Sequence, residues 1–273
     1  MTAPLFEPLG TRRFQPTELT RTGWNDIHQH GGPPSSLLVR ELERLSLPVP
    51  MRVARVTVQL LRGIPLEPLT VSADVVRAGK RVAVADAHLE TDHGEMVATA
   101  RAQLIRTEEV ELPADLPWPR EELPGPPESH PEPAEVASDP RGGWSDDSTT
   151  RFHLHAVSIR SIDGGWETPG PGAAWIHLDA DLVAGEETSP LCRFMCVADM
   201  TNGVSSILPY GRYRWINPDL TVAVHRPPDG AWFGLEGASS VGDDGIGVAH
   251  ATAFDQLGAF GHVIQTQLVQ PWD

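Results

Sequence analysis

Two stretches decide the fold: "VTVQLLRGIPL" at residues 56–66 and "LTVAVHRPPDG" at residues 220–230. Their matching residues stand 164 positions apart, and the same spacing returns further along the chain, where "ATARAQLIR" faces "HVIQTQLVQ". The pairs at this spacing include Thr57 and Thr221, Arg62 and Arg226, and Gln103 and Gln267. A constant offset over more than forty residues is typical of an internal duplication. The sequence therefore predicts two similar units in one chain.

Within each copy, a helical signal comes before a series of strands. In "HGGPPSSLLVRELERLSLP", Gly32 is placed as the N-cap and Pro33 as the first helical residue, and leucines follow at helical spacing. Alternating stretches separated by Gly and Pro turns come next. The strands expected are 11–19, 52–61, 69–79, 81–91 and 96–106, then 173–182, 219–227, 232–242, 247–256 and 261–270. We predict an α+β fold in which each unit wraps one long helix in an antiparallel sheet.

The segment between the two copies has a different composition. Residues 107–150 contain twelve acidic side chains and two arginines, and nine prolines interrupt them. Such a stretch is typical of an extended linker, which gives an N-terminal unit at 1–107, a linker at 108–148 and a C-terminal unit at 149–273. The alternative is a long ordered surface loop that packs through Trp118 and Trp144.

Composition narrows the classes of partner. The formal net charge is −16, which argues against nucleic acid or an anionic membrane, because both require basic patches. The sequence shows no apolar run long enough to span a membrane, and its opening lacks the apolar h-region of a signal peptide, so a cytoplasmic location is expected. Cys192 and Cys196 are four residues apart on one predicted helix, where a disulfide is geometrically poor, and we expect reduced thiols that pack in the core.

An acidic residue interrupts the apolar stretch "RFMCVADMTNGVSSILP" at residues 193–209. On a helix, Asp199 would share a face with Met195 and Gly203, which favour burial. A half-buried carboxylate can have its pKa tuned for acid–base chemistry. The alternative is structural, because Asp commonly caps helices and a helix could restart at Met200.

The chain resembles the double-hotdog acyl-CoA thioesterases, specifically the acyl-CoA thioesterase II group and its actinobacterial relatives. The resemblance rests on "HGGPPSSLL" in the first copy and on "VADMTNGVS", "INPDLTVAVHRP" and "VIQTQLV" in the second. It covers almost everything except the acidic segment. It implies a double hotdog fold and hydrolysis of an acyl-CoA, or a related acyl thioester, to a free acid and CoA, with no cofactor.

The resemblance also implies roles for residues of the second copy. Asp199 matches the family's acid, and Gln265 matches the amide that would hold the attacking water while the carboxylate takes its proton. Gln267 faces the same side of the strand and is an alternative. Asn217 stands where the family has Ser or Thr, which puts a hydroxyl-dependent step in doubt, and Thr221 is the nearest hydroxyl.

The first copy would contribute the other part of the site. The repeat offset places Ser35 opposite Asp199, so this copy has no matching acid. Gly31 and Gly32 lie instead before a helix N-terminus, where backbone N–H groups can bind the oxyanion formed during thioester attack. His30 lies beside them as a substrate-binding or catalytic candidate. The alternative is that the glycines only allow a tight entry into the helix.

Several other readings stay open. A hotdog enzyme that dehydrates or hydrates an acyl chain could use Asp26, His28 and His30 as acid and base, and a non-catalytic acyl- or polyketide-binding protein would not need the missing hydroxyl. His28, His30, His153 and His155 form two closely spaced pairs, but no carboxylate lies near them at ligand spacing, so no metal is expected. We expect an acyl-CoA substrate and a homodimer of double-hotdog units.

Overall fold

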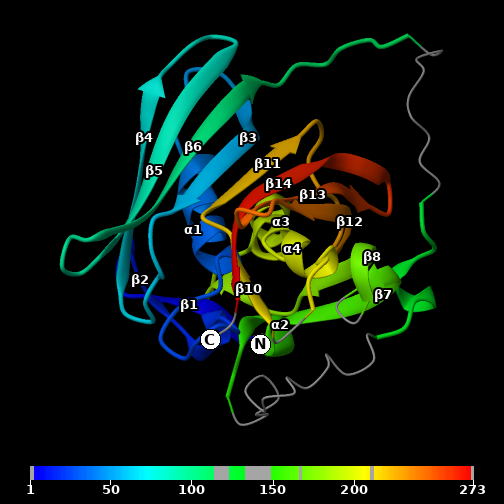
Figure 1. The fold of residues 1–273 in the computed structure, drawn as a ribbon. Coiled ribbons are helices and arrows are strands. Elements are labelled where there is room, and N and C mark those ends of the chain that lie inside the picture. The colour runs from blue at the N-terminus through cyan, green and yellow to red at the C-terminus, as the bar shows by residue number, and fades with distance from the viewer. Residues whose placement is uncertain (1–2, 114–122, 133–148, 166–167, 210–211, 272–273) are drawn as a thin grey trace.

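The computed structural model describes residues 3–113, 123–132, 149–165, 168–209 and 212–271 (Figure 1). In the first half of the chain the elements are β1 (Pro4–Pro8), β2 (Arg13–Pro16), η1 (Glu18–Thr20), α1 (Gly32–Glu43), β3 (Met51–Leu60), β4 (Leu69–Arg77), β5 (Val82–Thr91) and β6 (Met96–Arg106). After η2 (Pro127–Ser129), the second half contains α2 (Phe152–His155), β7 (Val157–Gly165), β8 (Thr168–Leu178), β9 (Asp181–Val183), α3 (Pro190–Ala198), α4 (Thr201–Val204), β10 (Tyr213–Ile216), β11 (Asp219–Val224), β12 (Trp232–Val241), β13 (Ile246–Asp255) and β14 (Gly258–Pro271).

The described strands form one continuous sheet, and its order shows the duplication. Outward from the centre, the first half runs β3-β6-β5-β4-β2-β1 and the second half runs β11-β14-β13-β12-β8-β7. These orders match strand for strand. At the centre, β3 and β11 pair antiparallel with Thr57 opposite Thr221, and the two hydroxyls lie 3.0 Å apart. The 164-residue offset therefore corresponds to an internal two-fold relation between two units.

Alternation of side chains along the strands places the helices inside the curve of the sheet. Every second residue of β5 is buried, as a sheet with one covered face requires. In Figure 1, α1 lies against the concave side of β3 to β6, and α3 and α4 lie behind β11 to β14. Each unit is therefore a helix wrapped by an antiparallel sheet, as predicted.

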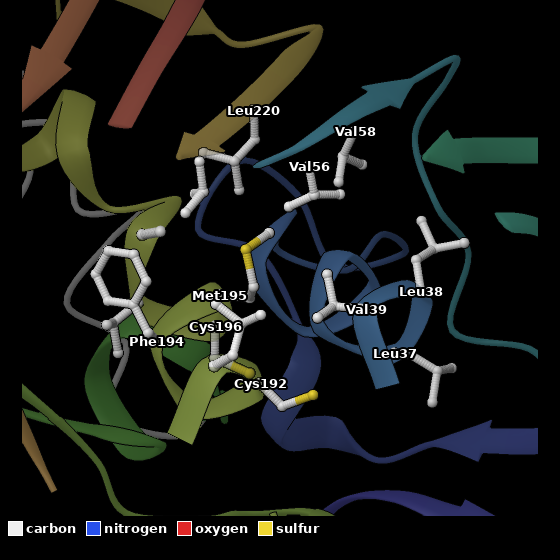
Figure 2. Close-up of a cluster of buried hydrophobic side chains, with 14 of the residues drawn as sticks. Leu37, Leu38, Val39, Val56, Val58, Cys192, Phe194, Met195, Cys196 and Leu220 are labelled. Atoms are coloured by element: carbon white, nitrogen blue, oxygen red, sulfur yellow. The ribbon is translucent and has the colours of Figure 1, made fainter. Parts of the chain in front are cut away.

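The two helices meet at the centre of the molecule. Figure 2 shows Met195 of α3 extending toward Val56 and Leu220, between the helices and the central strands. Ser36 of α1 donates a hydrogen bond of 2.8 Å to the backbone carbonyl of Cys192 on α3. Cys192 and Cys196 are buried and unbridged, so both thiols pack in this core.

The second helix is shorter than α1 because it is interrupted. Ser189 caps α3 by accepting a hydrogen bond of 3.1 Å from the Cys192 N–H. The helix ends at Ala198 with Asp199 as its C-cap, and α4 begins at Thr201. No side-chain hydrogen bond caps α4, so the carboxylate of Asp199 is available for other contacts.

Part of the acidic segment is ordered against the second unit. Trp175 on β8 donates its indole N–H to the Gly125 carbonyl at 3.1 Å, and the Ser161 N–H bonds to Pro131 at 2.9 Å. The stretch 123–132 therefore packs on β7 and β8. Trp118 and Trp144 lie outside the described residues.

Three strands were not expected from the sequence, β1, β7 and β10, and the strand expected at 173–182 is divided between β8 and β9. Of these, β9 pairs in parallel with β1, so a strand of the second half joins the edge of the first unit's sheet. Helix α1 begins at Gly32 with Gly31 as its N-cap, one residue earlier than predicted. Among the described residues, no helix has the length and apolar character needed to cross a membrane.

Candidate active site

The carboxylate of Asp199 lies at the junction of the two units and is almost fully buried, with 4% of the residue exposed. Its Oδ1 accepts a hydrogen bond of 2.7 Å from Asn217 Nδ2, at the turn between β10 and β11. The same oxygen accepts a bond of 3.0 Å from Gln265 Nε2 on β14. Two amides of the second unit therefore hold one oxygen of the carboxylate.

The other carboxylate oxygen faces the first unit. His30 Nδ1 lies 3.0 Å from Asp199 Oδ2. The Gly32 N–H donates a hydrogen bond of 3.2 Å to His30 Nδ1 and also hydrogen-bonds the Asp199 carboxylate. The Gly32 N–H is thus shared between the His30 ring nitrogen and the Asp199 carboxylate, and it links the two side chains.

These donors determine the charge of Asp199. Burial by itself raises the pKa of a carboxyl group, but the charge of His30 and the hydrogen bonds from His30, Asn217 and Gly32 lower the pKa of Asp199 below its ordinary value. Asp199 is therefore ionised at neutral pH. We call Asp199, His30, Asn217 and Gln265 the Asp199 cluster.

The two glycines allow the units to approach this closely. A Cβ on Gly31 would lie 2.7 Å from Asp199 Oδ2, and a Cβ on Gly32 would lie 2.1 Å from the backbone carbonyl oxygen of Cys196. Real Cβ atoms do not make contacts this short. Since Gly31 and Gly32 belong to one unit and Asp199 and Cys196 to the other, a side chain at Gly31 would displace the Asp199 carboxylate and one at Gly32 would displace the backbone of α3.

A cavity of about 470 Å³ opens beside the carboxylate. We call it the inter-unit cavity, because both units line it. Its lining includes Trp24 and Trp215, whose rings meet edge to face with centroids 5.8 Å apart. Other lining residues are Thr22, Asn25, His28, His30, Gly31, Leu60, Arg62, Ile64, His153, Asp199, Met200, Gly203, Ile216, Asn217 and Leu268. Most of the wall area is apolar, and its polar residues include Asp199, His30 and Asn217 of the Asp199 cluster as well as others such as Asn25 and Arg62.

Both units of the chain match known family models. Residues 20–106 match the acyl-CoA thioesterase N-terminal domain, and residues 124–269 match the acyl-CoA thioesterase C-terminal domain. The chain belongs to the acyl-CoA thioesterase family. No curated protein matches the sequence.

Solved structures with the same fold include several thioesterases of the type II group. The candidate thioesterase II of Thermobifida fusca YX has a TM-score of 0.73 at 15% identity, over 99% of this chain and 98% of that one. The acyl-CoA thioesterase II TesB2 of Mycobacterium marinum has a TM-score of 0.66 at 16% identity, over 98% and 96%. The tesB protein of Mycobacterium avium subspecies paratuberculosis has a TM-score of 0.67 at 15% identity, over 97% and 96%. The predicted double hotdog fold is thus confirmed.

In this thioesterase family member, the structure brings together most of the residues singled out by sequence. His30, Gly31 and Gly32 of the first unit meet Asp199 and its two amide partners of the second. The repeat partner of Asp199, Ser35, instead donates its hydroxyl to the Gly31 carbonyl at 2.7 Å. The structure thus has one carboxylate at this junction and contributions from both units around it.

The structure also separates the two candidate glutamines. Gln265 is completely buried, and its Oε1 accepts the Asn202 N–H at 3.2 Å. Its amide nitrogen donates a hydrogen bond to the Asp199 carboxylate. Gln265 therefore holds the carboxylate in place, and it does not line the inter-unit cavity. Gln267 points the same way from β14 but lines a small separate cavity.

Thr221 is not brought to the cluster. Its neighbours Leu220 and Val222 point into the core, so alternation turns Thr221 to the other face of the sheet, where it meets Thr57. Asp26 does not join the cluster either, because it is exposed and forms an ion pair of 3.0 Å with Arg151. His28 bonds to Asn25 at 3.0 Å. Of the histidines proposed for acid–base chemistry, His30 is the one that meets Asp199.

Sequence reasoning missed the aromatic walls of the site. Trp24 and Trp215 line the cavity, and Phe152 stacks on the His30 ring with centroids 4.8 Å apart. The position of Trp215, two residues before Asn217 on a strand, was the available signal. Within the described ranges, no three His, Cys, Asp or Glu side chains are arranged to hold a metal ion.

Proposed function

We propose that this chain hydrolyses an acyl-CoA thioester in the inter-unit cavity, with water activated at the Asp199–His30 pair. The observation that carries the proposal is an ionised, buried carboxylate held against a histidine at the wall of a largely apolar cavity, in a chain of the acyl-CoA thioesterase family. The cavity volume is within the range typical of small-molecule sites. Its largely apolar wall suits the acyl group, and the Asp199 cluster suits the reacting thioester.

The chemistry requires a base and a site for developing negative charge. Water attacks the thioester carbonyl carbon, the carbonyl oxygen becomes an oxyanion, and the C–S bond then breaks to release acid and thiol. Gly31 lines the cavity at the start of α1, and its N–H bonds to no other described residue. We assign this N–H to the oxyanion. The Gly32 N–H is engaged by Asp199 and serves the carboxylate instead.

The departure at Asn217 is compatible with this assignment. A hydroxyl at this position would donate one hydrogen bond to Asp199, and the Asn217 amide does the same at 2.7 Å. Its second bond, of 3.2 Å to the Asp219 carbonyl, fixes the orientation of the amide. The position therefore orients the carboxylate without needing a hydroxyl.

The proposal is tested by thiol release from butyryl-, octanoyl-, palmitoyl- and benzoyl-CoA. Wild type should release free CoA thiol with at least one of them, and Asp199→Asn should lower the rate by about 10² to 10⁴-fold, the usual share of a positioned acid–base group. Asp179→Asn is a matched control, because Asp179 also pairs with a histidine, His177 at 2.6 Å, but lies outside the cavity lining. Saturable binding of the acyl-CoAs without thiol release would instead support a non-catalytic acyl-binding protein.

A further inference from the structure

The residues that line the inter-unit cavity range from exposed to buried. Asn25 and Arg62 are exposed, whereas Met200 and Trp215 each expose 3% of their surface. The phosphates of CoA are charged and costly to bury, so the CoA part of the substrate stays at the exposed side. The acyl group lies on the other side of the thioester, and it therefore extends from the Asp199 cluster toward Met200 and Trp215.

Beyond Trp215 lies the small cavity that Gln267 lines, which we call the second-unit cavity. Its volume is about 10 Å³, roughly the space of one water molecule. Its lining includes Leu208 and Ser239 and belongs entirely to the second unit. Of the described residues, Asn202 and Trp215 line both this cavity and the inter-unit cavity. These two residues therefore form the partition between the cavities.

The indole of Trp215 is the larger part of the partition. On β10 Trp215 is buried and Ile216 is exposed, so the indole points to the covered side of the sheet. It meets Trp24 of the first unit edge to face, with centroids 5.8 Å apart, and Trp24 lines the inter-unit cavity but not the second-unit cavity. Removal of the Trp215 indole would therefore join the two cavities, whereas removal of the Trp24 indole would only widen the first.

The second-unit cavity can accept an apolar chain. Ser206 donates its hydroxyl to the Leu208 carbonyl at 3.2 Å, and the Ser239 hydroxyl lies 2.9 Å from that of Ser205. Leu208 and Val269 add apolar side chains to the wall. Since these hydroxyls are hydrogen-bonded within the protein, an acyl chain that enters the cavity would not leave them buried without a partner.

We infer that Trp215 limits the length of the acyl group, because its indole closes the buried end of the inter-unit cavity. This inference rests on the proposed function and gives Trp215 a role in specificity without a part in the chemistry. Without the indole, the chain continues past Asn202 into the second-unit cavity. Each methylene that becomes buried improves binding by about fourfold, so two or three further methylenes correspond to about 10 to 100-fold in kcat/KM.

The experiment measures kcat/KM for thiol release from linear acyl-CoAs, from butyryl- to palmitoyl-CoA in steps of two carbons. In wild type, kcat/KM should rise with length and then fall at the length at which the chain meets Trp215. In Trp215→Ala, chains longer than the wild-type optimum should gain about 10 to 100-fold relative to the wild-type optimum chain. Because the comparison is a ratio within each variant, a general loss of activity does not affect it.

Milder substitutions keep the test valid if Trp215→Ala does not fold. Trp215→Leu and Trp215→Phe retain more of the buried volume, and the gain for long chains should decrease in the order Ala, Leu, Phe. Trp24→Ala is the matched control, since it removes the other ring of the pair without reaching the second-unit cavity. Its optimum length should be that of wild type.

The outcomes separate this inference from the proposed function. If wild type releases thiol but every folded Trp215 variant keeps the wild-type length profile, the inference is wrong and the proposed function stands. The same conclusion follows if Trp24→Ala shifts the optimum as much as Trp215→Ala, or if kcat/KM of wild type still rises at palmitoyl-CoA. Absence of thiol release from wild type with every acyl-CoA would overturn both.

Discussion

Substitution of the adjacent glycines by alanine should have two different effects, because their Cβ atoms would meet different neighbours. At Gly31 the new methyl group would lie 2.7 Å from Asp199 Oδ2 and 2.9 Å from Leu60 Cδ1. Both are ends of side chains, which can move by the roughly 0.5 Å or more needed to reach ordinary contact distance. At Gly32 the methyl group would lie 2.1 Å from the Cys196 backbone carbonyl, which cannot move without shifting α3.

We therefore expect Gly31→Ala to fold and to lose activity. A displacement of this order at a reacting group can cost roughly 10²-fold, so the rate of thiol release should fall by about 10 to 100-fold with little change in thermal midpoint. Gly32→Ala forces α1 and α3 apart and should cost about 1 to 3 kcal/mol, as overpacking of a close contact does. Its thermal midpoint should fall by several degrees.

The assay measures thiol release and thermal unfolding on both variants in parallel. Gly10→Ala is a suitable control, since a Cβ there would meet no atom within 4 Å. Full activity in Gly31→Ala together with an unchanged thermal midpoint in Gly32→Ala would refute the close approach of the two units at the cluster.

The remaining predictions concern the partners and the charge of Asp199. Asn217→Asp replaces a donor by a second carboxylate, which raises the pKa of the pair, and should lower thiol release by about 10 to 100-fold at neutral pH, with the loss decreasing if the assay is repeated at higher pH. Gln265→Ala should destabilise the protein by about 1 to 3 kcal/mol in chemical denaturation, because it leaves buried partners unsatisfied, and should slow hydrolysis, whereas Gln267→Ala should keep the wild-type rate. Because the pKa of Asp199 is lowered in the folded state from its ordinary 3.8, its ionisation stabilises the fold above that pH, and this contribution is lost as the pH falls through the folded value. The thermal midpoint of wild type should therefore decrease more steeply below about pH 4 than that of Asp199→Asn; parallel curves for the two proteins would contradict the assigned charge.

The sequence predicted the symmetric part of the fold well, for a physical reason. Strands buried on one face repeat every two residues, so "RVAVADAHLET" is recognisable without context. The offset between Thr57 and Thr221 reflects a real contact, because these residues pair across the central strands. Short strands were missed, since β1 has five residues and β10 has four, too few to show an alternating pattern of their own.

The sequence predicted most residues of the site but not the contacts between them. The Asp199 carboxylate could be selected because an acid in an apolar helix is unusual, but the sequence could not show that two amides and a histidine meet it. The contact between His30 and Asp199 joins residues 169 positions apart through the packing of two helices. Strand alternation did place Gln265 and Gln267 on one face, but only packing decides which of them reaches the carboxylate.

The most direct test of the account is a single turnover in water labelled with ¹⁸O, with enzyme in excess over the acyl-CoA that wild type hydrolyses fastest. Direct attack by water held at the Asp199–His30 pair predicts one ¹⁸O atom in the carboxylic acid released in the first turnover, and none in the protein. If Asp199 attacked the thioester itself to form an anhydride and water then opened the anhydride at the Asp199 carbonyl, the first acid would be unlabelled and the label would appear in Asp199. That result would contradict the account.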